Sequence, residues 1–162
     1  IQIEPDYEQA HNNLGIIFIK LREYQKAISC FQKAIQLNSN NASAHSNLGI
    51  ALKQLGEYQK AIGCYEKAIQ IDPNYAEAYY NLGNVLRELC EYQKAINYYE
   101  KAINVKPDHV KTYNNILFTS LHFEKDNPNF YLSKAKEFRS SLKPIADQLL
   151  LKSHQIYWPR SP

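Results

Sequence analysis

The stretch HSNLGIALKQLGEYQKAI, residues 45–62, decides the architecture because two similar copies of it occur elsewhere in the chain. One close copy, HNNLGIIFIKLREYQKAI, covers residues 11–28, and another, YYNLGNVLRELCEYQKAI, covers residues 79–96. The step between copies is 34 residues, as the glycines of the Leu-Gly pairs show at Gly15, Gly49 and Gly83. A fixed period of this length is typical of proteins built from stacked, near-identical units.

Each unit is predicted to fold as two antiparallel helices. In residues 42–75 the apolar side chains recur at helical spacing in two stretches, the first around Leu52 and the second from Ala61 to Ile69. Gly49 and Ala61 are small, so the two helices of one hairpin can approach closely. Pro73 ends the second helix because proline lacks the backbone N–H that a continuing helix needs. Since one hairpin cannot bury its apolar face alone, neighbouring units are expected to stack.

The pattern resembles the tetratricopeptide (TPR) repeat, which combines a Leu-Gly pair, regularly spaced aromatic and alanine positions, and a closing proline. This resemblance implies an all-α, right-handed TPR solenoid of helix-turn-helix units. In its frame the complete units are residues 8–41, 42–75 and 76–109, and residues 110–162 form a partial repeat followed by a helical cap or connector. Residues 1–7 (IQIEPDY) parallel residues 69–75 (IQIDPNY), so we expect them to end a truncated preceding repeat.

Composition narrows the class of partner. The 162 residues carry 19 Lys and Arg against 16 Asp and Glu, a formal charge of +3. This excess is too small for a dedicated nucleic-acid binder. No stretch approaches the ~18 apolar residues of a membrane span, and the three cysteines form no disulfide framework. We expect a cytoplasmic piece of a longer chain that binds neither nucleic acid nor membrane.

No motif in the sequence predicts catalysis. A Gly-rich phosphate loop, G-x-S-x-G, H-E-x-x-H and C-x-x-C are all missing from the chain. Cys30 and Cys64 stand at equivalent repeat positions, which places them on neighbouring hairpins about 10 Å apart. That separation is too large for two ligands of one metal ion. We therefore expect no cofactor, no metal and no enzymatic activity in this fragment.

The repeat continues for one helix after Val110 and then stops, because Leu117 takes the small-residue position and no EYQKAI follows. Further helices are expected at about residues 131–142 and 145–152. This tail resembles the connector between repeats and catalytic domain in the O-GlcNAc transferase and SPINDLY-like family, through residues 115–118, 127–129, 135–139 and 159–162. The resemblance implies a protein glycosyltransferase whose catalytic domain follows Pro162. The alternative is a non-enzymatic adaptor or assembly scaffold, and in both cases exposed solenoid ends can self-associate.

Asparagine recurs immediately before the Leu-Gly pair, and its register continues into the tail: Asn13, Asn47, Asn81 and Asn115. We call these four residues the asparagine ladder. Asparagine is an indifferent helix former, but its carboxamide both donates and accepts, as a peptide group does. A ladder on the concave face could therefore hold an extended peptide by its main chain, and the O-GlcNAc transferase resemblance implies the same role. The alternative is that the ladder bonds neighbouring hairpins and orders the stack.

The ladder's expected neighbours on the concave face are mixed in character: Asn12, Lys20, Lys53, Tyr80, Asn84, Arg87 and Asn114. Such a weakly charged groove argues against a clamp for terminal carboxylates, which needs Lys and Arg; Asn12 stands where the first lysine of that clamp would be. The partner is thus expected to be a protein or extended peptide. If the groove is open, replacing Asn47 and Asn81 with alanine should weaken peptide binding and leave the fold intact.

Overall fold

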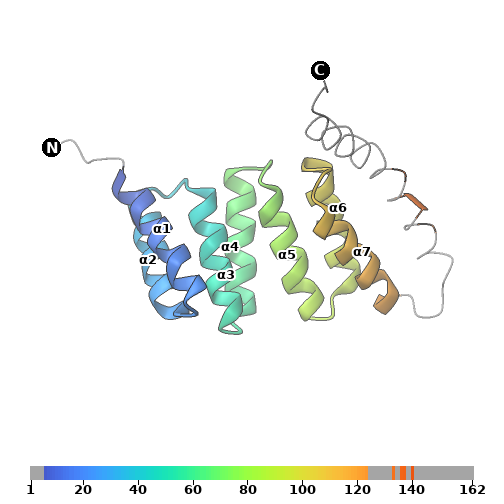
Figure 1. Cartoon of the computed structure of the whole chain (residues 1–162), viewed down its shortest axis with the longest axis horizontal. Helices are drawn as coiled ribbons and strands as arrows, with labels where there is room; N and C mark the ends of the chain where they lie inside the picture. Colours follow the sequence, from blue (N-terminus) through green and yellow to red (C-terminus); the bar gives the residue numbers. More distant parts are fainter. Residues whose placement is uncertain (1–5, 124–132, 134–135, 138–139, 141–162) are drawn as a thin grey trace, which may run out of the picture.

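The computed structural model describes residues 6–123, 133, 136–137 and 140. Residues 6–123 form seven α-helices and no strand, arranged in a row (Figure 1). In chain order they are α1 (Asp6–Lys20), α2 (Tyr24–Leu37), α3 (Ala42–Gln54), α4 (Tyr58–Ile71), α5 (Ala76–Glu88), α6 (Tyr92–Val105) and α7 (Val110–Phe123).

The helices pack as successive hairpins. The pairs α1–α2, α3–α4 and α5–α6 form the tightest contacts, and α2–α3, α4–α5 and α6–α7 join one hairpin to the next. This arrangement confirms the predicted all-α solenoid. The helices expected at residues 131–142 and 145–152 lie outside the described residues, apart from residues 133, 136–137 and 140. The truncated preceding repeat was expected in residues 1–7; residues 1–5 lie outside the described residues, and Asp6 and Tyr7 belong to α1.

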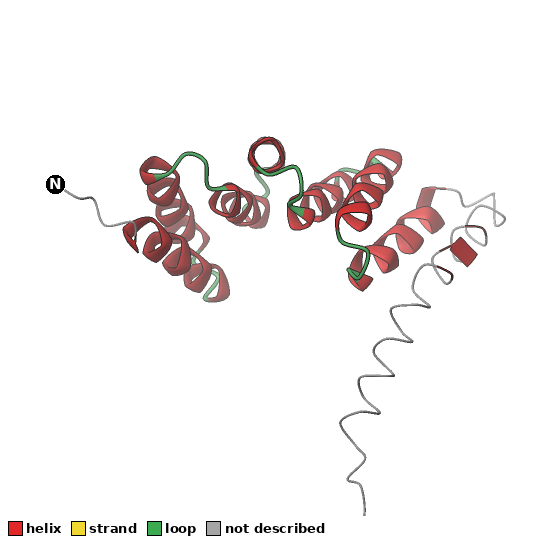
Figure 2. Cartoon of the chain, turned by 90° about the horizontal axis from the view of Figure 1, so that it is seen from above, coloured by secondary structure: helices red, strands yellow, loops and turns green. Residues whose placement is uncertain are grey.

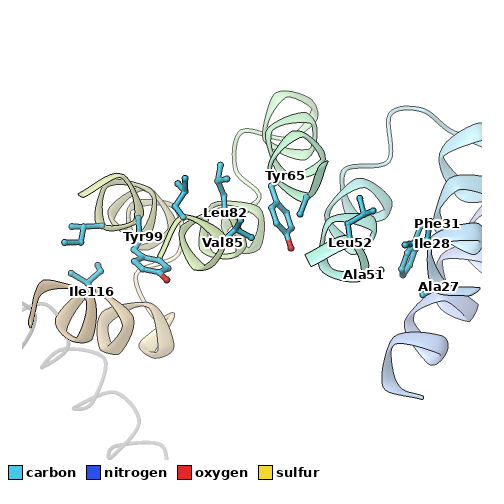
Figure 3. Packing of buried hydrophobic residues seen from close by; sticks show 14 of the residues in the cluster. Ala27, Ile28, Phe31, Ala51, Leu52, Tyr65, Leu82, Val85, Tyr99 and Ile116 are labelled. Carbon is cyan, nitrogen blue, oxygen red and sulfur yellow. The ribbon is translucent and has the colours of Figure 1, made fainter. Parts of the chain in front are cut away.

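Glycine at the Leu-Gly pair lets an aromatic ring of the second helix lie directly against the backbone of the first. A Cβ atom at Gly49 would be 2.7 Å from the Tyr65 ring, and one at Gly83 would be 2.6 Å from the Tyr99 ring. Both tyrosines are completely buried. They belong to a core that runs from Phe31 to Ile116 along the whole row of helices (Figure 3). Each repeat therefore has both the glycine and the aromatic residue, because the ring packs against the backbone of the glycine.

The turn inside each hairpin uses a left-handed residue. The φ angles are 60° at Arg22, 77° at Gly56 and 61° at Cys90, and these positions are 34 residues apart. Only the middle turn has the glycine that this conformation favours. The other two hairpins hold an ordinary side chain there, at a conformational cost.

The first helix leaves part of its apolar surface uncovered. Leu14 and Ile17 of α1, and Leu21 directly after it, are all more than 40% exposed. The equivalent residue of Ile17 in the second unit, Ala51, is fully buried. Self-association through such an end stays a prediction. Within residues 6–123, no helix combines the length and the apolar character needed to cross a bilayer.

Candidate functional site

The first helix of each hairpin lies on the inner side of the molecule. Besides its own hairpin partner, α3 contacts both α1 and α5. Seen from above, the hairpins follow a shallow arc, with α1, α3, α5 and α7 along its inner side (Figure 2). We call this surface the concave face. The asparagine ladder was expected on this face.

The four ladder asparagines are in different environments despite their regular spacing. Asn13 is exposed, and its Oδ1 accepts a hydrogen bond from Gln9 of the same helix at 3.3 Å. Asn47 is half-buried and donates from Nδ2 to Asn12 Oδ1 at 3.1 Å and to Ser43 Oγ at 3.4 Å. The bond from Asn47 to Asn12 crosses from α3 to α1. Asn47 therefore joins two repeats.

The last two members of the ladder contrast with each other. Asn115 donates from Nδ2 to Asn84 Oδ1 at 2.8 Å, which joins α7 to α5. The same Asn84 oxygen accepts a hydrogen bond from the Tyr99 hydroxyl, also at 2.8 Å. Asn81 is half-buried, and no side-chain hydrogen bond involves it in the described part of the chain. The ladder thus contains two inter-repeat links and one half-buried carboxamide that is free to bind.

Asn12, expected among the ladder's neighbours in the groove, is buried in the structure. Only 3% of Asn12 is exposed, because it lies beneath Asn47. The expectation that the fold tolerates alanine at Asn47 rested on an open groove, whereas Asn47 donates to a buried partner. Its replacement would leave the buried Asn12 oxygen without a donor, and such an unsatisfied group costs free energy.

Two of the remaining predicted neighbours, Lys53 and Arg87, make contacts between helices. Lys53 Nζ of α3 lies 2.7 Å from Glu88 Oε1 of α5, so its charge is neutralised locally. The Arg87 guanidinium lies 5.8 Å from the centre of the Phe118 ring on α7. Lys20 and Asn114 are exposed. The concave face therefore presents few free charges.

Aromatic rings from three elements meet at the third repeat. The Tyr80 ring lies 6.0 Å from Tyr99 and 5.0 Å from His109, centre to centre. Burial raises the pKa of Tyr99 to about 12, so its hydroxyl stays protonated and can donate to Asn84. Burial also lowers the pKa of His109, with nearby Lys106 acting in the same direction.

A pocket of about 200 Å³ lies where α5, α6 and α7 meet, and five residues line it: Arg87, Glu88, Tyr92, Phe118 and Thr119. The sequence reasoning missed Glu88, which does not recur at the repeat period. Tyr65 lies within the apolar stretch from Ala61 to Ile69 and was expected only to pack in the core. The hydroxyl of Tyr65 is buried and has no hydrogen-bond partner in the described structure. The sequence does distinguish Tyr65 from its equivalent in the first unit, Phe31, because only the tyrosine carries a hydroxyl.

Together these features define a helical repeat protein with a weakly charged concave face. The family model for the tetratricopeptide repeat matches residues 6–74 and, overlapping them, 40–108, and the chain belongs to this family. No curated protein matches the chain by sequence.

Several solved structures are similar to this chain. A crystal structure of MamA has a TM-score of 0.73 and 28% identity, covering 90% of this chain and 82% of its own. The Sgt2 TPR domain from Aspergillus fumigatus has a TM-score of 0.72 and 25% identity, covering 76% of this chain and 83% of its own. The first TPR of Spaghetti (RPAP3), bound to the HSP90 peptide SRMEEVD, has a TM-score of 0.70. It is 20% identical and covers 76% of this chain and 98% of its own. At this identity the similarity is evidence only for a shared fold.

Proposed function

We propose that the concave face binds an extended segment of a partner protein and that it recognises mainly the main chain of that segment. The observation that carries the proposal is the carboxamide of Asn81, which is half-buried in the middle of the face and makes no hydrogen bond within the described residues. A carboxamide matches the donor and acceptor of a peptide group. The similarity to TPR domains, one of them solved with a bound peptide, supports the same function.

The charge on the face favours an uncharged main chain over an acidic tail. Lys53 is paired with Glu88, and Arg87 lies over Phe118. Asn12, at the position of the first clamp lysine, is buried and neutral. A cluster of free cations able to hold terminal carboxylates is therefore missing from the described part of this face.

The wider role of the binding face has two candidates. Delivery of polypeptide to a glycosyltransferase domain is supported by the asparagine ladder together with the connector resemblance, most of which falls outside the described residues. A non-enzymatic adaptor or assembly scaffold is supported equally by the similarity to TPR domains. In both roles the chain acts by binding. Sequencing the gene beyond the codon for Pro162 discriminates them, since only the first requires a nucleotide-sugar-binding domain.

Fluorescence anisotropy with labelled peptides tests the binding proposal. We would use three uncharged peptides of about twelve residues, rich in Ser and Thr, in Ala and Val, or in Gln and Gly, each spanning about 40 Å when extended. The peptide SRMEEVD would be the acidic-tail control. We expect similar affinities for the three uncharged peptides and weaker binding of SRMEEVD. Binding of none of them would refute the proposal, and a clear preference for SRMEEVD would indicate a carboxylate clamp instead.

A further inference from the structure

The junctions between successive repeats differ in one set of three positions. Between α5 and α7 the set is complete: the Tyr99 hydroxyl and the Asn115 carboxamide both donate to Asn84 Oδ1, each at 2.8 Å. Two donors thus converge on one oxygen. This closed network shows the geometry that the repeat places at the floor of the concave face.

The same three positions between α3 and α5 hold Tyr65, Ile50 and Asn81, each 34 residues earlier in the chain. Both donors are present, but isoleucine replaces the residue that supplies the accepting oxygen. The Tyr65 hydroxyl is buried without a partner, and Asn81 makes no side-chain hydrogen bond in the described structure. By repeat equivalence the two donors flank one position, and Ile50 supplies no acceptor there.

The first junction has a third arrangement, with Phe31, Ile16 and Asn47 at the three positions. Phenylalanine has no hydroxyl to satisfy, and Asn47 donates to Asn12 and Ser43 instead. Among the described residues, neither of these positions holds a buried side-chain donor without a partner. The middle junction is thus distinct from its two neighbours.

We propose that the Tyr65 hydroxyl and the Asn81 carboxamide bind one main-chain carbonyl of the partner segment between α3 and α5. This inference rests on the proposed function and adds a fixed register to it, since one peptide group is held at one place in the groove. A carbonyl oxygen supplies the acceptor that Asn84 supplies at the next junction. A buried donor without a partner costs free energy in the unbound protein, so an acceptor that reaches it gains more than a surface bond would.

Two features of the junction favour this ligand group and show how it enters. The Tyr65 ring points from α4 toward the concave side, between α3 and α5 (Figure 3). By repeat equivalence the half-buried Ile50 side chain lies beside the hydroxyl, so the proposal requires this side chain to move aside when the carbonyl binds. The negative charge of Glu88 contributes, after burial and Cys64, to raising the pKa of Tyr65, which disfavours an anionic acceptor there.

The test compares three substitutions in the peptide assay described above. Tyr65→Phe should weaken binding of all three uncharged peptides by about three- to tenfold, the effect of one lost hydrogen bond. Tyr58→Phe, which removes a half-buried hydroxyl from the same helix, is the matched control and should bind as the wild type does. Ile50→Asn should supply the missing acceptor internally, so it should raise the melting temperature and weaken binding.

The outcomes separate this inference from the proposed function. If the wild type binds the peptides and Tyr65→Phe binds them equally well, the inference is overturned while the proposed function stands. A purely structural Tyr65 predicts that result, together with an unchanged or higher melting temperature, because the substitution removes an unsatisfied hydroxyl. If the wild type binds no peptide, both are overturned. A loss that appears with only one of the three peptides would also overturn it, since a main-chain contact is independent of side chains.

Discussion

Replacing Asn47 with alanine should destabilise the protein, because it removes the donor that satisfies a buried oxygen. Only 3% of Asn12 is exposed, so its Oδ1 cannot exchange the lost bond for one with bulk water. The lost bond is worth about 0.5–1.5 kcal/mol, and an unsatisfied buried acceptor costs about 1–3 kcal/mol. The better helix propensity of alanine offsets about 0.5 kcal/mol of this. We expect a net loss of about 1–2 kcal/mol, which lowers the melting temperature by about 2–8 °C.

Asn81→Ala is the matched control because it occupies the same repeat position without a side-chain hydrogen bond in the described structure. Its melting temperature should stay the same or rise slightly, since alanine favours the helix. Its affinity for the uncharged peptides should fall by about two- to tenfold, the effect of one hydrogen bond. The two variants thus separate the structural from the binding role of the ladder. Thermal melts by circular dichroism and anisotropy titrations on the same samples measure both effects.

A double-mutant cycle identifies the bond responsible. If the link from Asn47 to Asn12 carries the effect, Asn12→Ala combined with Asn47→Ala should destabilise less than the sum of the single changes. Equal melting temperatures for Asn47→Ala and Asn81→Ala would refute the reasoning. Additive effects in the cycle would refute the assignment to this pair of side chains.

Three further predictions concern the stability of the repeats. Gly83→Ala places a Cβ 2.6 Å from the Tyr99 ring and should lower the free energy of unfolding by about 1–3 kcal/mol. Gly63→Ala, where a Cβ would have no atom within 4 Å, should raise it by about 1 kcal/mol because alanine favours the helix. Urea unfolding measures both changes. Cys90→Gly relieves a left-handed side chain at φ 61° and should raise the melting temperature, and a decrease would show that the thiol side chain stabilises the turn. Because burial lowers the pKa of His109 in the folded state, the unfolded state binds the proton more readily. Stability should therefore fall as the pH drops through about 6.5, and less steeply in His109→Gln.

The fold could be predicted from the sequence because its determinants recur at one period. The contact between Gly83 and Tyr99 repeats the contact between Gly49 and Tyr65, so each copy supports the interpretation of the others. The position of Pro73 also predicted a helix end, and α4 ends at Ile71. The left-handed turns were not predicted, since only Gly56 of the three residues is a glycine. A conformation imposed by the geometry of the hairpin leaves no sign in a residue such as Arg22.

The candidate site could be predicted only in part, because what each ladder asparagine does depends on neighbours that break the period. Asn47 and Asn81 both stand immediately before a Leu-Gly pair. Asn47 donates to Asn12 across the junction, whereas Asn81 makes no side-chain hydrogen bond in the described structure. Identical residues on identical backbones thus differ in whether a partner is within reach. The repeated residues build the scaffold, and the positions at which one repeat differs from another decide which polar groups stay free for a ligand. In this chain those departures single out the junction of α3 and α5.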